Sequence, residues 1–179
     1  MRVIAGTLRG RRLATPGWDG LRPTSDRLRE TLFNILADRV SGSVVLDGYA
    51  GTGAIGVEAI SRGAGAVVFV DRDPRAVALI TNNLGRCAIA ERGKVVTGTL
   101  PGALAILPSV PFDLILLDPP YECDQEEIDA ILCAAGACLA SDGRVVLERT
   151  RRAVTIEVAG LAHLRRVTSG DSALDFYGR

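Results

Sequence analysis

Residues 47–53, DGYAGTG, decide the fold of this 179-residue chain. They close a short apolar run at 44–47 and precede a helical stretch at 54–62, so a buried strand passes through a glycine-rich loop into a helix. The alternation continues with a second expected helix at 75–84 and with further expected strands at 66–71, 94–97, 112–118 and 143–148. Two more strands, joined at 169–171, are expected in the tail. The pattern predicts an α/β fold with a mostly parallel, doubly wound sheet.

A hairpin and a helix are expected before the first strand. Residues 1–15 alternate weakly around two glycines, which predicts a hairpin that can be mobile when nothing is bound. Thr24 or Ser25 can cap the helix that follows. Its apolar side chains recur at helical spacing at Leu28, Leu32, Ile35 and Leu36. Arg27 and Glu30 lie off this stripe, so we expect them to face the solvent or a substrate.

Composition indicates a soluble, single-domain protein. A chain of this length buries roughly 70% of its unfolded surface, so its core needs no disulfide or metal. It has no apolar run approaching about 18 residues. Residues 1–10 also lack the apolar segment of a secretory signal, so we expect a cytoplasmic protein. Four cysteines without a CxxC pair, and His163 as the single histidine, form no zinc pattern, so no metal is expected. We expect a monomer.

Charge is divided unevenly along the chain. Residues 1–39 contain eight arginines and four acidic residues, whereas residues 40–179 contain 13 basic and 17 acidic residues. A basic segment on an acidic domain is typical of a protein that faces a polyanion. We therefore divide the chain into a basic N-terminal arm, 1–39, and a catalytic domain, 40–179.

The tetrad Asp118-Pro119-Pro120-Tyr121 follows the apolar run at 112–117 and suits the methylation of a planar amino group. The lone pair of such a nitrogen is delocalised, so the nitrogen is a poor nucleophile. Asp118 can accept one N–H hydrogen bond and the Pro119 carbonyl another, which aims the lone pair at an electrophilic methyl group. Pro119 and Pro120 fix their own φ and push the residue before each toward extended conformations, which holds Asp118 in a defined pose, and Tyr121 offers a face for stacking. The alternative is a proline-rich turn with Tyr121 in the core.

The glycine-rich loop is compatible with two kinds of cofactor. Residues 51–56 match GxGxxG, and Asp71 lies 20 residues beyond Gly51, as in proteins that bind a nicotinamide dinucleotide. Asp47, however, would bring negative charge to a pyrophosphate, and the tetrad at 118–121 has no role in hydride transfer. S-adenosylmethionine carries an ammonium group and a sulfonium that suit Asp47, and ribose hydroxyls that suit Asp71. We therefore expect S-adenosylmethionine.

Four stretches together resemble one family, the RsmD family of small-subunit (16S) ribosomal RNA guanine-N2 methyltransferases. These stretches are 47–53 (DGYAGTG), 70–74 (VDRDP), 118–121 (DPPY) and 22–36 (RPTSDRLRETLFNIL). The first three occur in many amino-methylating enzymes, and the fourth is much more specific. The resemblance extends from 2–6 (RVIAG) to 176–178 (FYG) and so covers essentially the whole chain. It implies a class I Rossmann-like methyltransferase fold and transfer of a methyl group from S-adenosylmethionine to guanine N2.

The resemblance also implies roles for individual residues. Asp47, Gly51 and Gly53 would line the methionine part of the cofactor, with Tyr49 in the same loop, and Asp71 would bind its ribose. Residues 118–121 would hold the target amine. Residues 97–99 (TGT) stand where an Asp or Asn often contacts the adenine, so we expect that contact from Thr99 or from the backbone near Leu100. Gly48-Tyr49 replaces a common Leu-Phe and is expected to loosen the loop.

The implied partner is 16S ribosomal RNA, free or within a partly assembled small subunit. Arginines of the arm and a second cluster after the strand at 143–148 are the expected RNA contacts, namely Arg9, Arg11, Arg12, Arg22, Arg27, Arg149, Arg151 and Arg152. Two alternatives remain open at this point. One is an adenine-N6 or protein glutamine-amide methyltransferase, and the other is a non-catalytic RNA-binding assembly factor.

Overall fold

One seven-stranded sheet forms the centre of the protein, in the order β3-β2-β1-β4-β5-β7-β6. The structure, a computed structural model, describes residues 1–18, 24–107 and 111–179. Strands β1 to β5 are parallel, and β7 runs antiparallel to its two neighbours. The strands are β1 (Val44–Gly48), β2 (Ala66–Asp71), β3 (Gly93–Thr97), β4 (Phe112–Leu117), β5 (Leu139–Thr150), β6 (Ala162–Ser169) and β7 (Ser172–Gly178). The predicted mostly parallel sheet is confirmed.

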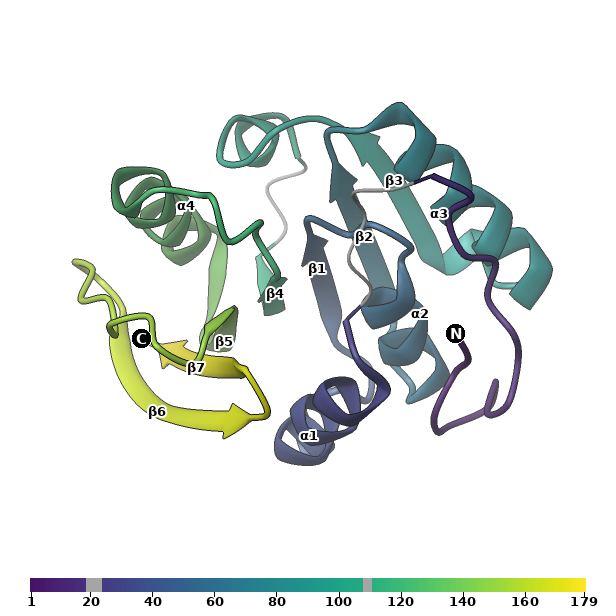
Figure 1. Cartoon of the computed structure of the whole chain (residues 1–179), viewed down its shortest axis with the longest axis horizontal. Coiled ribbons are helices and arrows are strands. Elements are labelled where there is room, and N and C mark those ends of the chain that lie inside the picture. The colour runs from purple at the N-terminus through teal and green to yellow at the C-terminus, as the bar shows by residue number, and fades with distance from the viewer. Residues whose placement is uncertain (19–23, 108–110) are drawn as a thin grey trace.

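Helices pack on both faces of this sheet (Figure 1). The α-helices are α1 (Asp26–Leu36), α2 (Ala54–Ser61), α3 (Pro74–Cys87) and α4 (Gln125–Cys138), and the 3-10 helices are η1 (Ala37–Arg39), η2 (Ala90–Arg92) and η3 (Gly102–Ile106). Helices α1, α2 and α3 confirm the three helices that the sequence predicts. Helix α4 was not predicted. No helix in the described part of the chain is long and apolar enough to cross a membrane.

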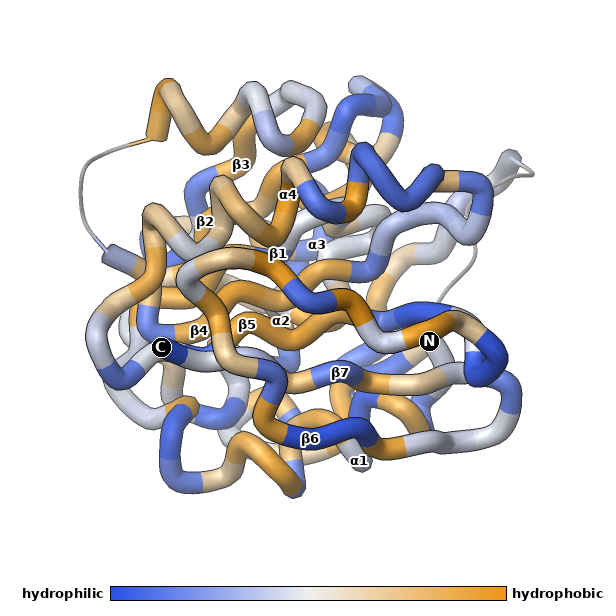
Figure 2. Tube along the Cα trace, turned by 90° about the vertical axis from the view of Figure 1, so that its left-hand side faces the viewer, coloured by the Kyte–Doolittle hydropathy of each residue, from blue (hydrophilic) through white to orange (hydrophobic). Residues whose placement is uncertain are grey.

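Two apolar clusters, one on each face, explain why the inner strands β1, β2 and β4 are mostly hydrophobic. Successive residues of a strand point to opposite faces. Val45 of β1 therefore packs with α1, α2 and α3, while its neighbour Leu46 packs with α4 and η3. Figure 2 shows the apolar strands β1, β4 and β5 running through the interior. A parallel sheet covered on both faces requires such continuous apolar runs.

Polar residues set where the helices begin. The Ser25 hydroxyl accepts the Leu28 N–H at 3.2 Å, which confirms one of the two predicted caps of α1. Asp73 caps α3 in the same way, and Pro74 occupies the first turn, where its missing N–H costs nothing. Asp124 caps α4. These caps position the helices whose N-terminal ends face the carboxyl edge of the sheet.

The strand order creates a crevice at that edge. From β1 the chain crosses to β2 on one side, and β4 lies on the other side of β1. The loops that follow β1 and β4 therefore diverge, and in open α/β sheets ligands bind in the crevice between them. Residues 47–53 and 118–121 follow these two strands, so the fold places both motifs beside one crevice.

Candidate active site

A pocket of about 580 Å³ opens at the carboxyl edge of the sheet. Its lining includes Gly51 of the glycine-rich loop, Asp71 at the end of β2, and all four residues of the tetrad at 118–121. The volume lies within the range of about 300–1,000 Å³ that is usual for small-molecule sites. The structure thus brings together, in one pocket, three of the residues expected at the cofactor, Tyr49, Gly51 and Asp71, and all four expected at the target; Gly53 is absent from the described lining.

The glycine-rich loop is fastened to Asp71. The Gly51 N–H donates to Asp71 Oδ2 at 2.8 Å, and the Asp73 N–H donates to Asp71 Oδ1 at 2.9 Å. Gly51 and Gly53 have φ values of 54° and 74°, which glycine adopts without strain. Tyr49 also has a positive φ of 61°, and it lines the pocket. Each Asp71 oxygen keeps a further lone pair, so the carboxylate can still accept two hydroxyl groups.

Asp47 lies beneath this loop, and it is absent from the described lining of the pocket. Its Oδ2 accepts the Gly56 N–H at 2.8 Å, and the residue is 1% exposed. Burial raises the pKa of the Asp47 carboxyl well above its usual range, and the charges of Asp118 and Asp71 raise it further. The hydrogen bond from the Gly56 N–H acts in the opposite direction and lowers this pKa. The structure therefore gives Asp47 a visible role in holding the loop against α2, and its contact with a cofactor stays a prediction.

The expected loosening at residues 48 and 49 is not what the structure shows. A Cβ atom at Gly48 would stand 2.7 Å from Leu100 Cδ1 and 2.8 Å from Leu117 Cδ2. The glycine is thus enclosed by two leucines, which would have to move if a larger residue took its place. The close packing holds the start of the loop against the sheet.

Asp118 is held at the pocket by a residue of the arm. The Thr24 hydroxyl donates to Asp118 Oδ2 at 2.7 Å, and both residues line the pocket. Pro119 is buried behind Asp118, and Pro120 is exposed. Tyr121 is 42% exposed, so the alternative that places its ring in the core is wrong. The tetrad presents a fixed carboxylate and an accessible aromatic ring to the same cavity.

Three further pocket residues carry polar or aromatic groups that the sequence analysis missed. Glu148, at the carboxyl end of β5, accepts the Ser172 hydroxyl at 2.8 Å. Trp18, in the arm, lies under the guanidinium of Arg75 at 5.1 Å from the ring centroid. The position of Glu148 at the end of an expected strand was a usable signal for the same edge. Trp18 and Ser172 reach the pocket through tertiary contacts that no local pattern records.

The two residues expected near the adenine lie beside the pocket, outside its described lining. Thr99 is exposed, and its carbonyl accepts the Ala103 N–H at 2.8 Å. Leu100 is 6% exposed and belongs to the apolar cluster beneath α4. Their contact with a cofactor remains a prediction.

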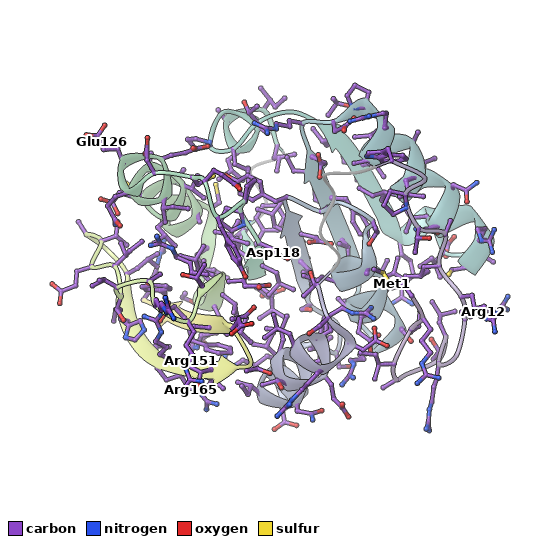
Figure 3. All side chains as sticks on the ribbon, in the orientation of Figure 1. Met1, Arg12, Asp118, Glu126, Arg151 and Arg165 are labelled. Atoms are coloured by element: carbon purple, nitrogen blue, oxygen red, sulfur yellow. The ribbon has the colours of Figure 1, made fainter. Side chains whose placement is uncertain are left out.

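Two of the expected RNA-binding arginines, Arg12 of the arm and Arg151 after Glu148, lie on opposite sides of Asp118 (Figure 3). Most of the expected set are exposed, namely Arg9, Arg11, Arg12, Arg27, Arg151 and Arg152. Arg149 is only half-buried, and its Nη1 is enclosed without a hydrogen-bond partner among the described residues. Arg22 lies outside the described residues. None of these exposed arginines belongs to the described lining of the pocket.

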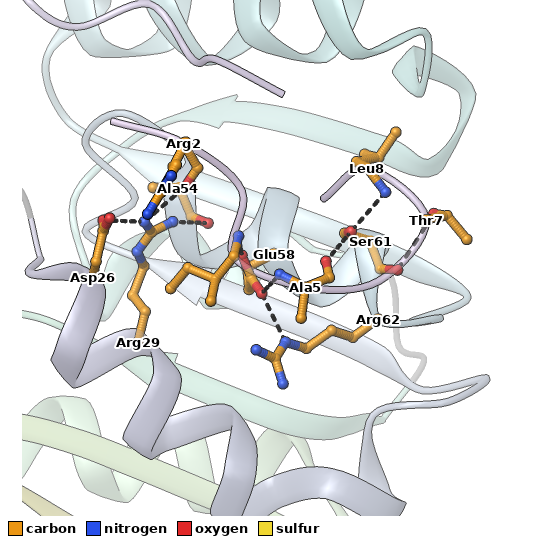
Figure 4. A network of polar contacts seen from close by, with 11 residues as sticks. Arg2, Ala5, Thr7, Leu8, Asp26, Arg29, Ala54, Glu58, Ser61 and Arg62 are labelled. Atoms are coloured by element: carbon orange, nitrogen blue, oxygen red, sulfur yellow. Dashed lines mark hydrogen bonds and ion pairs between the residues drawn. The ribbon is translucent and has the colours of Figure 1, made fainter. Parts of the chain in front are cut away.

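The arm is fastened to the domain, contrary to the mobile hairpin expected from the sequence. Its ladder is a single bridge between Arg2 and Arg12. The buried carboxylate of Glu58 in α2 accepts the N–H groups of Ile4 at 2.8 Å and Ala5 at 3.0 Å (Figure 4). Arg29 of α1 is fully buried and donates to the Arg2 carbonyl at 2.9 Å. Backbone groups at residues 2–5 are thus bound to α1, within the arm, and to α2, beyond it.

Arg29 also links the arm to the glycine-rich loop. Its guanidinium donates to Asp26 Oδ1 at 2.7 Å and to the carbonyl of Ala54, the first residue of α2, at 3.4 Å (Figure 4). A buried arginine is costly unless it is paired and hydrogen-bonded, so these contacts fix the position of α1 against α2. In the described ranges, no group of three or more His, Cys, Asp or Glu side chains could hold a metal ion.

Comparison with known proteins places the chain in a family. The family model described as Conserved hypothetical protein 95 matches residues 1–178. The Ribosomal RNA small subunit methyltransferase D of Haemophilus influenzae is 39% identical over 137 residues, which are 74% of this chain and 70% of that protein.

Solved structures agree with this placement. The hypothetical protein TTHA0928 of Thermus thermophilus is 30% identical with a TM-score of 0.83, covering 100% of this chain and 99% of that chain. Precorrin-6y C5,15-methyltransferase of Geobacter metallireducens GS-15, at 21% identity, a TM-score of 0.66 and 92% coverage of both chains, shares the fold. The chain therefore has the class I Rossmann-like methyltransferase fold and belongs to the Conserved hypothetical protein 95 family, which is the RsmD family that its motifs indicated.

Proposed function

We propose that this protein transfers a methyl group from S-adenosylmethionine to the exocyclic N2 of a guanine in 16S ribosomal RNA. The strongest support is that Asp71 and all four residues of the tetrad at 118–121 line the same pocket. A cofactor at Asp71 and an amine at Asp118 would then share a single cavity. The relative from Haemophilus influenzae, named Ribosomal RNA small subunit methyltransferase D, supports the choice of RNA.

The pocket fits the cofactor on its own geometry. Gly51, a left-handed glycine of the pocket lining, lets the backbone approach a ligand closely, and Asp71 keeps lone pairs for ribose hydroxyls. Gly51 and Gly53 would border its methionine part. The cofactor would supply an electrophilic methyl group, and every other contribution comes from the chain itself.

The residues of the chain position the amine. Asp118 accepts one N–H of the target, the Pro119 carbonyl accepts the other, and the nitrogen lone pair is thereby directed into the pocket. As the nitrogen bonds the methyl carbon, the bond from that carbon to sulfur would break, and the nitrogen would release one proton to Asp118 or to the solvent. Tyr121, with its accessible ring, stacks on the extruded base. Thr24 keeps the carboxylate of Asp118 in place through its 2.7 Å hydrogen bond. Neither a metal nor a covalent enzyme intermediate is needed for these steps.

The RNA would lie across the pocket, between the arginines of the arm and those that follow β5. Both groups are mostly exposed, and Arg12 and Arg151 lie on opposite sides of Asp118. Specific recognition of RNA favours loops whose bases can be splayed out, and a base turned toward Tyr121 would enter between the two groups. The backbone phosphates on either side would then meet the arginines.

Incubation with S-adenosylmethionine labelled in its methyl group tests the proposal. The protein is mixed in turn with unmodified 16S ribosomal RNA, with the assembled small subunit and with an unrelated protein mixture. We expect label in one of the two RNA substrates and none in protein. Label in a glutamine side chain, or no transfer to either RNA substrate while the cofactor binds, would contradict the proposal.

A further inference from the structure

A second carboxylate stands beside Asp118 at the same edge of the sheet. Strands β4 and β5 are parallel, and Leu117 pairs with Leu147. Asp118 follows β4 directly and Glu148 follows Leu147 within β5, so the paired residues lead straight to the two carboxylates. Both line the 580 Å³ pocket. The methyl-transfer steps described above use Asp118 and leave Glu148 without a role.

Glu148 is held in a defined position. It is 6% exposed, and its Oε1 accepts the Ser172 hydroxyl at 2.8 Å. The Tyr121 hydroxyl lies 3.5 Å from the same oxygen and 3.4 Å from the Ser172 hydroxyl. A buried carboxylate is costly unless hydrogen bonds compensate it, so this arrangement indicates a group kept in place for its acceptor capacity. Tyr121 joins it directly to the ring on which the target base would stack.

Guanine and adenine differ in the ring groups that lie next to their exocyclic amine. In guanine the exocyclic N2 stands beside N1–H, a second donor on the same edge of the base. In adenine the exocyclic N6 stands between N1 and N7, which are both acceptors. With guanine bound, Asp118 can accept from the N2 amine and Glu148 from N1–H. With adenine bound, Asp118 can accept from the N6 amine, but Glu148 would face the lone pair of a ring nitrogen. A site that hydrogen-bonds an N–H group rejects analogues that lack it.

We propose that Glu148 accepts the N1–H of the target guanine and so makes the enzyme select guanine over bases with an acceptor at that position. The assignment rests on the proposed transfer to guanine N2. Ser172 positions Glu148, and Tyr121 couples its placement to stacking. Glu148 is thus a specificity residue, distinct from Asp118, which receives the amine that reacts.

The test uses an RNA substrate in which the mapped guanosine is replaced by 2,6-diaminopurine riboside. This base keeps the N2 amine but has an acceptor at N1. Wild-type protein should prefer guanine by at least about a hundredfold in kcat/KM. In Glu148→Gln the side-chain amide can donate to that N1, so the preference should fall at least about tenfold, mainly through faster methylation of 2,6-diaminopurine. Inosine, which lacks the amine, should accept no methyl group from either protein.

Glu122→Gln is the matched control, because Glu122 also lines the pocket but is exposed at its rim. It should keep the wild-type preference. If Glu148→Gln does not fold, Ser172→Ala tests the same arrangement, and the preference should fall at least about threefold with one hydrogen bond removed. An unchanged preference in the folded variant overturns the assignment while the proposed function stands. Wild-type label on a nucleoside other than N2-methylguanosine overturns both.

Discussion

Thr24 and Asp118 are joined by a hydrogen bond of 2.7 Å between the threonine hydroxyl and Asp118 Oδ2. Thr24 precedes α1 by two residues, and Asp118 follows β4 directly. The contact therefore links the N-terminal arm to the residue that we expect to hold the target amine. A hydroxyl that donates to one oxygen of a carboxylate restricts the rotation of that carboxylate.

Replacing Thr24 should lower turnover more than it alters binding. Thr24→Val removes the hydroxyl at constant shape, and a hydrogen bond to a charged group contributes about 1.5–3 kcal/mol, so kcat should fall at least about tenfold. Thr24→Ser keeps the hydroxyl and should restore most of the rate. Steady-state kinetics separate kcat from KM. Equal losses in the valine and serine variants, or a change confined to KM, would show that Thr24 only supports the fold.

Asp71→Ala should weaken S-adenosylmethionine binding by about 1–3 kcal/mol, the range for removal of a charge-assisted hydrogen bond. The Gly51 and Asp73 N–H groups would lose their acceptor as well, so the loop should also become less ordered. Calorimetry measures the affinity, and the fluorescence of Trp18, the single tryptophan and a pocket residue, offers a second readout. NAD should bind negligibly, and NAD binding tighter than that of S-adenosylmethionine would refute the choice of cofactor.

The stability of the protein should depend on pH through Asp47. Its folded-state pKa is raised well above 3.8 because burial disfavours the charged carboxylate, so the native state holds a proton that the unfolded state releases. The wild type therefore loses free energy of unfolding as pH rises from 3.8 through the folded pKa. Asp47→Asn removes this dependence and retains an acceptor for the Gly56 N–H.

Urea unfolding of the wild type and of Asp47→Asn at several pH values checks this prediction. The stability of the variant relative to the wild type should increase as pH rises from about 4 to 8. Asp38→Asn, at an exposed site on η1, serves as the control and should show no such trend. A difference that stays constant, or that shrinks with rising pH, would mean that Asp47 is not the group responsible.

The arginines of the arm should set the salt dependence of RNA binding. Replacing Arg9, Arg11 and Arg12 together by Gln should weaken RNA binding and reduce the slope of log K against log salt by up to about two units, at about 0.7–0.9 for each phosphate that is no longer neutralised. S-adenosylmethionine binding should persist, because these side chains are exposed and lie outside the described pocket lining. Arg86→Gln, an exposed site on α3, is the control. A wild-type slope and wild-type RNA methylation in the triple variant would show that the arm is passive.

Local patterns were sufficient to predict much of this fold and part of the site. The apolar runs gave the strands because both faces of a parallel sheet are buried, and the glycine-rich loop and the tetrad meet because parallel strands end at one edge. The pairing of Thr24 with Asp118 could not be predicted, because it joins residues 94 positions apart. The buried Glu58, which fixes the arm, also looks like an ordinary surface residue of α2 until its contacts are known.

Burial was the other property that local patterns did not supply. The carboxylate of Asp47 suits a cationic ligand, and its contact with a cofactor stays a prediction; its burial and its hydrogen bond with the Gly56 N–H were not predicted. The sequence motif shows only that Asp47 begins the glycine-rich loop. Which way that carboxylate faces depends on the packing of α2 against β1, and only the three-dimensional arrangement determines it.

Single-turnover methylation of 16S ribosomal RNA by the wild type and by Asp118→Ala, with nucleoside analysis of the product, tests the central claim most directly. We expect the wild type to form N2-methylguanosine. We also expect the variant to be slower by at least about a hundredfold, comparable to the loss of one preorganised polar partner, and its cofactor affinity to change far less. Label in any other nucleoside, or a variant rate within a few-fold of the wild type, would contradict that claim.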